Sequence, residues 1–351
     1  MADRVELLGL NSDELLAFVT ETLGESKFRA KQIAEWLRRG AAIEEMTNLS
    51  AALRARLSEL AVANPVRIRE SFQSKLDGTE KFLYELSDGN LIEGVVMRYH
   101  YGDTLCVSTQ VGCRMGCAFC ASTLEGRLRN LSAGEILGQV VAANRHIQAQ
   151  DASRRIHNIV LMGSGEPFDN YDNVVKFLRL VNSPEGLNIS LRNISLSTCG
   201  LVDRIREFAK EGLPVTLSLS LHAPNDAIRR KIMPVASAHP YDSVIAACRH
   251  YSEVTGRRVV FEYALIKDVN CDLRCADELA ARLRGMRAHV NLIPLNDVKE
   301  RNLAAPSKKD VQAFLKRLEL KHISATIRRE MGADIDGACG QLRRRYLSEQ
   351  S

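Results

Sequence analysis

The sequence predicts an α/β fold built on a parallel β-sheet and preceded by a small helical block. Two observations support this prediction. From residue 156 onward, short segments rich in Val, Ile and Leu alternate with amphipathic segments of helical period. Between residues 66 and 110 the pattern is instead that of consecutive strands separated by Asp-Gly and Gly-Asp turns. Repeated strand–helix units place helices against a parallel sheet, which is either open or closed into a barrel.

Three helices are expected in the first 65 residues. The first covers residues 11–22, where Asn11 supplies an N-cap and Glu14 completes a capping-box pattern. The second is KFRAKQIAEWLRRG at residues 27–40, with Gly40 as its stop, and the third is ALRARLSELA at residues 52–61. Asn64 and Pro65 end this block. We therefore predict a helical accessory domain over residues 1–65.

The segments KFLYEL, LIEGVVMRY and TLCVSTQ form a predicted strand meander. We expect a β extension, of β-hairpin type, over residues 66–99, and the core domain over residues 100–346. Within the core, Ser132 and Glu135 form a capping box that opens a helix. The predicted core strands are HNIVLMGSG, NISLSTCG, VTLSLSLHA, VVFEYALIK and HVNLIPL.

Polar and glycine residues gather just after the predicted core strands. They are Gly163, Gly165, Glu166, Ser197, Ser220, His222 and Asn296. Ligands of parallel α/β proteins bind at the carboxyl ends of the strands. We therefore expect these residues to face one shared site.

Composition indicates an ordinary globular protein of the cytoplasm. The chain has 351 residues, a net charge of +5 and no run of about 18 apolar residues that could span a membrane. Its first residues lack the apolar stretch and cleavage site of a secretory signal. Nine cysteines in a cytoplasmic protein favour metal binding or catalysis over a disulfide framework. The mild positive charge permits a nucleic-acid partner without requiring one.

The most informative stretch is GCRMGCAFCAS, residues 112–122, in which Cys113, Cys117 and Cys120 have the spacing C-x-x-x-C-x-x-C. A structural zinc site needs four ligands, usually in two separated pairs, and no second pair follows here. An iron–sulfur cubane normally has four cysteine ligands. With only three cysteine ligands, one iron of such a cluster keeps an open coordination position.

This spacing resembles that of radical S-adenosylmethionine (SAM) enzymes. The resemblance narrows when further segments are included: LCVSTQVGCRMGCAFC, LMGSGEP, LSTCGL, SLSLHAPND, NLIPLN and IRREMGADIDGACGQL closely resemble the RlmN/Cfr family of radical SAM RNA methyltransferases. The resemblance covers residues 90–342, and the predicted helical block of residues 1–65 fits the accessory domain of the family. Ser164 stands where methionine is common in the family, and Asp297 stands where proline is frequent.

The resemblance implies a partial (βα)6 radical SAM barrel and assigns roles to individual residues. It implies that the three clustered cysteines bind a 4Fe-4S cluster and that two SAM molecules are used in each turnover. The residues implied to contact SAM are Gly165, Glu166, Ser197, Ser220, Leu221, His222 and Asn296. Cys339 is implied to carry the methyl group, Cys106 to resolve the intermediate, and Glu93 to accept a proton.

The expected chemistry explains why such residues are needed. Carbon 2 of adenine, the usual target of the family, lies between two ring nitrogens and is not nucleophilic. A thiolate is nucleophilic, so Cys339 can take a methyl group from one SAM. A radical made from the second SAM then activates that methyl group, which adds to the base. Glu93 and Cys106 are expected to release the product. Glu93 lies among apolar residues on its predicted strand, and such neighbours would raise its pKa.

The resemblance implies 23S rRNA and tRNA as partners, with a flavodoxin or ferredoxin as electron donor. Basic residues that could contact RNA are Lys27, Arg29, Lys31, Arg38, Arg39, Arg343, Arg344 and Arg345. Three alternatives remain open. They are Cfr-type methylation at carbon 8 of the same adenosine, a radical SAM reaction that does not involve RNA, and a zinc-containing RNA-binding module without catalysis.

Overall fold

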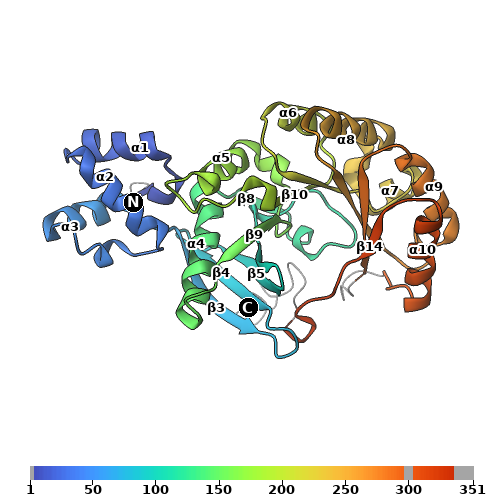
Figure 1. Ribbon diagram of the computed structural model, residues 1–351, viewed down its shortest axis with the longest axis horizontal. Helices are drawn as coiled ribbons and strands as arrows, with labels where there is room; N and C mark the ends of the chain where they lie inside the picture. The colour runs from blue at the N-terminus through green and yellow to red at the C-terminus, as the bar shows by residue number, and fades with distance from the viewer. Residues whose placement is uncertain (1–3, 296–302, 336–351) are drawn as a thin grey trace.

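A single ten-stranded sheet forms the centre of the protein (Figure 1). The structure is a computed structural model that describes residues 4–295 and 303–335. The strand order is β14-β13-β12-β11-β10-β9-β6-β5-β4-β3. The pairs from β14 to β6 are parallel, whereas those from β6 to β3 are antiparallel. The predicted β extension is therefore part of the same sheet as the core.

The helical block lies at one end of the molecule, in blue in Figure 1. It contains α1 (Ser12–Ala17), α2 (Lys27–Arg38) and α3 (Ala51–Leu60). The predicted capping box is present, since Asn11 accepts from the Glu14 amide and Glu14 accepts from the Asn11 amide. A short parallel pair, β1 (Val5–Glu6) with β2 (Ala61–Val62), ties the two ends of the block together. This pair was not predicted, because two-residue strands carry no periodic signal.

The three predicted strands of the meander are confirmed as β4 (Glu80–Leu86), β5 (Leu91–Tyr99) and β6 (Gly102–Cys106). A further strand, β3 (Val66–Gln73), precedes them and was not among the predicted segments. The predicted core strands appear as β9 (Ile156–Leu161), β10 (Ile194–Thr198), β11 (Thr216–Ser220), β12 (Val259–Leu265) and β13 (Ala288–Pro294). A last parallel strand, β14 (Ala325–Ile327), was not predicted.

Helices connect the parallel strands: α4 (Ala133–Gln150), α5 (Tyr171–Asn182), α6 (Val202–Lys210), α7 (Asp226–Ile232), α8 (Tyr241–Thr255), α9 (Leu273–Leu283) and α10 (Lys308–Leu320). The capping box of Ser132 and Glu135 at the start of α4 is present as predicted. Within the described residues, no helix is long and apolar enough to cross a membrane.

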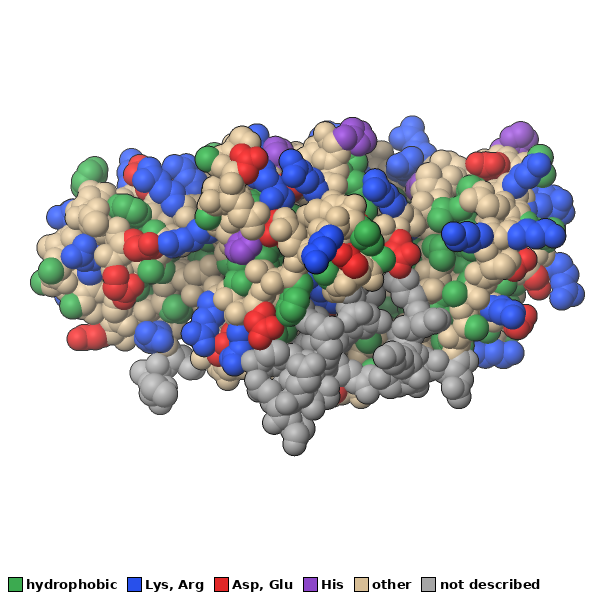
Figure 2. Space-filling view, turned by 90° about the horizontal axis from the view of Figure 1, so that it is seen from below, with side chains coloured by type: hydrophobic (Ala, Val, Ile, Leu, Met, Phe, Trp, Pro, Cys, Tyr) green, Lys and Arg blue, Asp and Glu red, His purple; other side chains and the backbone are tan. Residues whose placement is uncertain are grey.

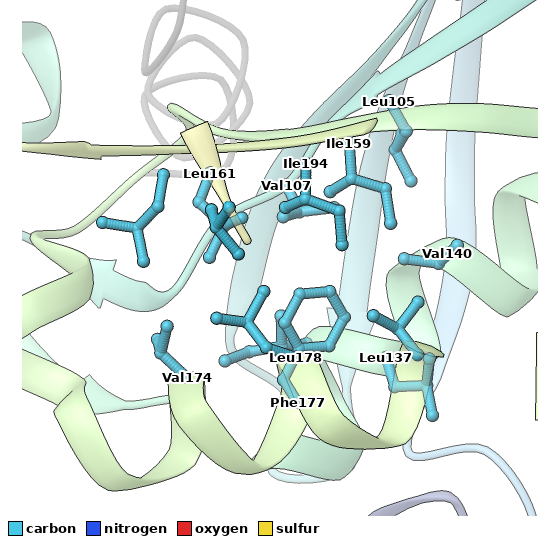
Figure 3. Packing of buried hydrophobic residues seen from close by; sticks show 14 of the residues in the cluster. Leu105, Val107, Leu137, Val140, Ile159, Leu161, Val174, Phe177, Leu178 and Ile194 are labelled. Atoms are coloured by element: carbon cyan, nitrogen blue, oxygen red, sulfur yellow. The ribbon is translucent and has the colours of Figure 1, made fainter. Parts of the chain in front are cut away.

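The hydrophobic core lies between the helices and one face of the sheet (Figure 3). Leu137 and Val140 of α4, with Val174, Phe177 and Leu178 of α5, pack against that face. The sheet side of this contact consists of Leu105, Val107, Ile159, Leu161 and Ile194. Burying each such side chain contributes about 1.5–3 kcal/mol. Because side chains alternate along a strand, the neighbouring residues point to the opposite face, which is the inner face of the sheet.

Candidate active site

The three clustered cysteines lie in one loop held between two short antiparallel strands. These are β7 (Gln110–Gly112) and β8 (Arg127–Asn130), which were not predicted as a pair. The loop closes where the Cys113 amide donates to the Gly126 carbonyl at 2.9 Å. Gly112 has a φ of +76°, and a Cβ atom there would lie 2.0 Å from the same carbonyl oxygen. Glycine is therefore required at the entrance to the loop.

The thiols have largely apolar surroundings. Cys113 and Cys117 are buried, and Cys120 is half-buried. Among the described residues, no three His, Cys, Asp or Glu side chains are gathered as ligands of a single metal ion. Burial raises the pKa of Cys113 to about 12 and raises that of Cys117 further. Bound iron stabilises thiolates, and three thiols in one apolar loop are the donors that an iron–sulfur cluster uses. The residues therefore fit a 4Fe-4S cluster.

The loop is fastened to the segment that follows β9. The Arg114 guanidinium, between the first two cysteines, contacts Asp169 through two hydrogen bonds, of 3.0 and 2.5 Å. Arg127 and Gln110 donate to the same carboxylate at 2.9 and 3.0 Å. These groups lower the pKa of Asp169, although burial acts in the opposite direction. The sequence did not reveal this network, because its members are 42 to 59 residues from Asp169 along the chain.

Gly165 and Glu166 lie where β9 meets this loop. Gly165 has a φ of +108°, and a Cβ atom there would lie 2.6 Å from the Gln110 side chain. Glu166 is buried, and its two carboxylate oxygens accept from the amides of Phe168 at 3.1 Å and Cys199 at 2.7 Å. Burial raises its pKa despite these bonds. Glu166 thus ties the ends of β9 and β10 together in addition to any role in binding SAM.

Ser197, Ser220 and His222 are close to one another at the ends of β10 and β11. The two serine hydroxyls are 3.3 Å apart. His222 adopts a left-handed backbone conformation, and its Nδ1 accepts from the Ala264 amide at 2.9 Å. Burial and the nearby Arg229 lower the pKa of His222 to about 3, so the imidazole is neutral. Its ring packs edge-on against Phe119 of the cysteine loop, with ring centroids 4.7 Å apart.

Leu221 and Arg229 complete this region. The Leu221 side chain is fully buried and its amide donates to the Glu262 carbonyl at 3.1 Å, so the second lone pair of its carbonyl oxygen is what it can still offer to a ligand. Arg229 of α7 is also fully buried and donates to the carbonyls of Cys199 at 2.6 Å and Leu221 at 3.2 Å. Arg229 therefore holds together the strand ends that carry the two serines. The sequence analysis did not identify it, because its only local signal was that of a basic helix.

Glu93 lies on the inner face of β5, with 6% of its surface exposed, and forms an ion pair of 3.0 Å with Lys81. Lys81 is completely buried and was not singled out from the sequence. Val95, two residues after Glu93, pairs with Cys106 of β6, so Glu93 and Cys106 share this face. Glu93 is therefore not an edge-strand charge turned to solvent. Its carboxyl group is instead held against a buried ammonium on the inner face of the sheet.

Residues 331–335 return to the same part of the sheet. Met331 packs against the cluster of Val95, Met97 and Cys106. The Gly332 amide donates to Asp77 at 2.9 Å, and Asp334 accepts from the Ser74 hydroxyl at 2.6 Å and the Lys75 amide at 2.9 Å. We call this set of contacts between the β3–β4 turn and residues 332–334 the turn anchor. Cys339, Asn296 and Arg343–Arg345 lie outside the described residues.

Comparison with known proteins agrees with this geometry. Residues 107–274 match the Radical SAM superfamily, and residues 5–63 match the ribosomal RNA large subunit methyltransferase N-terminal domain. The chain is 49% identical to a probable dual-specificity RNA methyltransferase RlmN of Lachnospira eligens, covering 98% of this chain and 97% of that protein. It is 51% identical to the corresponding protein of Alkaliphilus metalliredigens, covering 99% and 97%.

The structure is also similar to a solved one. A radical SAM methyltransferase from Sphaerobacter thermophilus superposes with a TM-score of 0.92 at 43% identity, covering 97% of this chain and 99% of that one. The predicted radical SAM fold is therefore confirmed. Radical SAM enzymes use a 4Fe-4S cluster and SAM, so both cofactor predictions are confirmed as well. The zinc module and the reaction without RNA are excluded. This chain belongs to the RlmN family of radical SAM RNA methyltransferases.

Proposed function

We propose that this enzyme methylates carbon 2 of an adenosine in 23S rRNA, and of an adenosine in tRNA. The observation that carries the proposal is the near full-length similarity to relatives named dual-specificity RNA methyltransferases. The match of residues 5–63 to a ribosomal RNA methyltransferase domain supports rRNA as one substrate. The placement of Glu93 and Cys106 on one face of the sheet supports a reaction that uses both.

In this proposal three side chains perform the steps after SAM has bound. When bound, the cluster and SAM supply the one-electron cleavage that activates the methyl group. Cys339 holds that methyl group on its sulfur and, after it adds to the base, remains joined to the RNA. Glu93, whose carboxylate lies 3.0 Å from the ammonium of Lys81, takes the ring proton, and the one electron that the adduct loses with it would return to the cluster. Cys106 then attacks the Cys339 sulfur and the two thiols become a disulfide. The electron pair of the broken carbon–sulfur bond stays on the methylene carbon, which takes up a proton, so that the base leaves with a methyl group.

The remaining assignments belong to the same proposal. SAM is contacted by Gly165, Glu166, Ser197, Ser220, Leu221, His222 and Asn296, and the cluster by Cys113, Cys117 and Cys120. Residues 1–65 act as an accessory domain, residues 66–99 extend the sheet, and residues 100–346 carry catalysis. The enzyme works in the cytoplasm, where its RNA is, and receives electrons from a flavodoxin or ferredoxin.

The test is to express the chain in bacteria that lack their own methyltransferase of this type. Ribosomal and transfer RNA are digested, and the nucleosides are compared by mass spectrometry with 2-methyl- and 8-methyladenosine standards. We expect 2-methyladenosine in both RNAs, and none with Cys339→Ala. A product of 8-methyladenosine would instead establish the Cfr-type alternative, which uses the same residues. Absence of both nucleosides from cells that assemble the cluster would disprove the proposed function.

The turn anchor is expected to matter for activity because residue 339 follows Asp334 by only five positions. Asp334→Ala removes the acceptor of the Ser74 and Lys75 bonds. We expect kcat for methylation to fall about tenfold or more, since misplacing a reacting group by about 1 Å can slow a reaction a hundredfold. SAM binding, measured by equilibrium dialysis, should stay unchanged. Asp310→Ala serves as the control, because Asp310 also accepts from a serine hydroxyl and a backbone amide, but at the start of α10 and not in the turn anchor. Equal rates for the two variants would contradict the prediction.

The basic residues of the N-terminal helices differ in whether their side chains are already bonded within the protein. Arg29 is bonded to Gln32 and to the Asn48 carbonyl, whereas Arg38 and Arg39 are exposed at the end of α2. Lys and Arg side chains are spread over both ends of the face shown in Figure 2, so on this face charge alone does not single out one RNA-binding patch. If Arg38 and Arg39 neutralise phosphates, replacing both by alanine should lower the slope of log K against log salt by about 2. An unchanged slope in filter-binding titrations would remove them from the interface.

A further inference from the structure

The inner face of the parallel sheet is polar across several strands. Ser195 of β10 pairs in register with Thr216 of β11, and their neighbours Ser197 and Ser218 are also paired. Ser220 is paired with Glu262 of β12, and Glu262 with Asn291 of β13. All of these side chains share one face, because residues paired across a sheet point to the same side. A polar row of this kind is suited to binding a ligand and contributes little to a hydrophobic core.

Glu262 is the residue in this row that packing alone does not explain. It is 4% exposed, and burial raises its pKa. Asn291 Nδ2 donates to its Oε2 at 2.8 Å, and within residues 4–295 and 303–335 the other oxygen accepts from no donor. This second oxygen is not one of the fully enclosed polar atoms that lack a partner, so it borders open space on the inner face of the sheet, where a ligand can reach it.

The other buried carboxylates in the described part of the chain differ from Glu262. Each has a cationic side chain or two backbone amides as partners. Glu93 pairs with Lys81, Asp103 with Arg154, Glu80 with Arg154 and His146, Glu135 with Arg129, and Glu166 with the amides of Phe168 and Cys199. Glu262 accepts one hydrogen bond, from a neutral amide, and Arg328, the cation that acts to lower its pKa, forms no ion pair with it within the described residues. This contrast indicates that the carboxyl group of Glu262 is left available for a ligand.

The position of Glu262 identifies where that ligand lies. Its own carbonyl accepts from the amides of Leu221 and His222, at 3.1 and 3.2 Å. Its side chain lies opposite Ser220, the strand-end serine proposed to contact SAM. The proposed reaction brings two adenosine groups to this end of the sheet, one in SAM and one in the RNA. Carboxyl groups bind the hydroxyls of ribose in other nucleotide sites, and they also accept from the amino group of adenine.

We propose that Glu262 and Asn291 form a binding site for an adenosine nucleoside on the inner face of the sheet. The inference rests on the proposed function, in which neither side chain has a role. Glu262 offers an oxygen to a ribose hydroxyl or to the adenine amino group. Asn291, whose Nδ2 orients the Glu262 carboxyl group, offers its amide oxygen. The nucleoside is either the adenosyl group of SAM or the target adenosine of the RNA.

Two affinities of the cluster-loaded enzyme distinguish these sources, and neither requires turnover. The first is the Kd for labelled SAM, measured by equilibrium dialysis without reductant. The second is the Kd for unmethylated 23S rRNA, measured by filter binding. We expect Glu262→Ala to raise one of them about tenfold. An effect on SAM assigns the site to the cofactor, whereas an effect on RNA with unchanged SAM binding assigns it to the substrate. Both values within twofold of wild type would overturn the proposal.

Three further variants make the result specific. Glu278→Ala is the matched control, because Glu278 of α9 accepts from the Asn225 side chain at the same 2.8 Å but lies on a helix outside the sheet. Its two affinities should stay at the wild-type values. Glu262→Gln keeps an acceptor and the shape of the side chain, and should retain most of the affinity. Asn291→Ala tests the same site if Glu262→Ala does not fold, and it should raise the same affinity. A wild-type enzyme that binds SAM but makes no methyladenosine would contradict the proposed function alone.

Discussion

Replacing Cys106 with alanine is expected to trap the RNA on the protein. In the proposed reaction the methylene carbon on the base is bonded to the sulfur of Cys339, and Cys106 supplies the thiol that breaks this bond. Cys106 is suited to the role because it lies at the carboxyl end of β6, on the same inner face as Glu93. Without it, addition to the base still occurs, whereas release does not. We expect free 2-methyladenosine to fall at least about a thousandfold, as for loss of an essential nucleophile.

The measurement is a denaturing gel of a reaction with labelled RNA. A slow band that is sensitive to both ribonuclease and protease should appear with Cys106→Ala and be absent with Cys106→Ala/Cys339→Ala. Cys248→Ala is the matched control, because Cys248 is a fully buried cysteine of α8 that packs in the hydrophobic core away from the inner face. It should turn over without a trapped band. Normal product formation by Cys106→Ala would show that another group releases the RNA.

Replacing Lys81 with methionine is expected to destabilise the fold more than any surface change. Lys81 is completely buried, and its ammonium lies 3.0 Å from the Glu93 carboxylate. Removing one partner of a buried ion pair leaves the other charge uncompensated in a medium that solvates it poorly. We expect the free energy of unfolding to fall by about 3–5 kcal/mol, measured by urea denaturation.

A double variant separates the charge effect from lost packing. Lys81→Met combined with Glu93→Gln removes both charges, and most of the lost stability should return. Lys309→Met, at an exposed position of α10, should change stability by no more than about 0.5 kcal/mol. If the double variant is no more stable than Lys81→Met, the ion pair is not the reason for the loss. The double variant should still methylate poorly, because glutamine cannot accept the ring proton.

Features that depend on neighbours along the chain could be predicted from the sequence. The capping boxes of Asn11 with Glu14 and of Ser132 with Glu135 are of this kind, and both are present. The apolar periodicity of the core strands is also local, and it located β9 to β13. The spacing of Cys113, Cys117 and Cys120 within one loop sufficed for the radical SAM prediction, which the comparisons confirm.

Features that join distant segments were decided only by the tertiary structure. Whether Glu93 faces solvent or the interior depends on the strands beside β5, and these bury it against Lys81. Arg229 and Asp169 act on residues about 30 to 60 positions away, and the turn anchor joins residues more than 250 positions apart. The side chain of Glu262 reads as one polar residue in an apolar strand until the register of β12 places it opposite Ser220. Sequence periodicity determines which face of an element is apolar, whereas the partners of a buried charge are set by the pairing of strands and the packing of helices on the sheet.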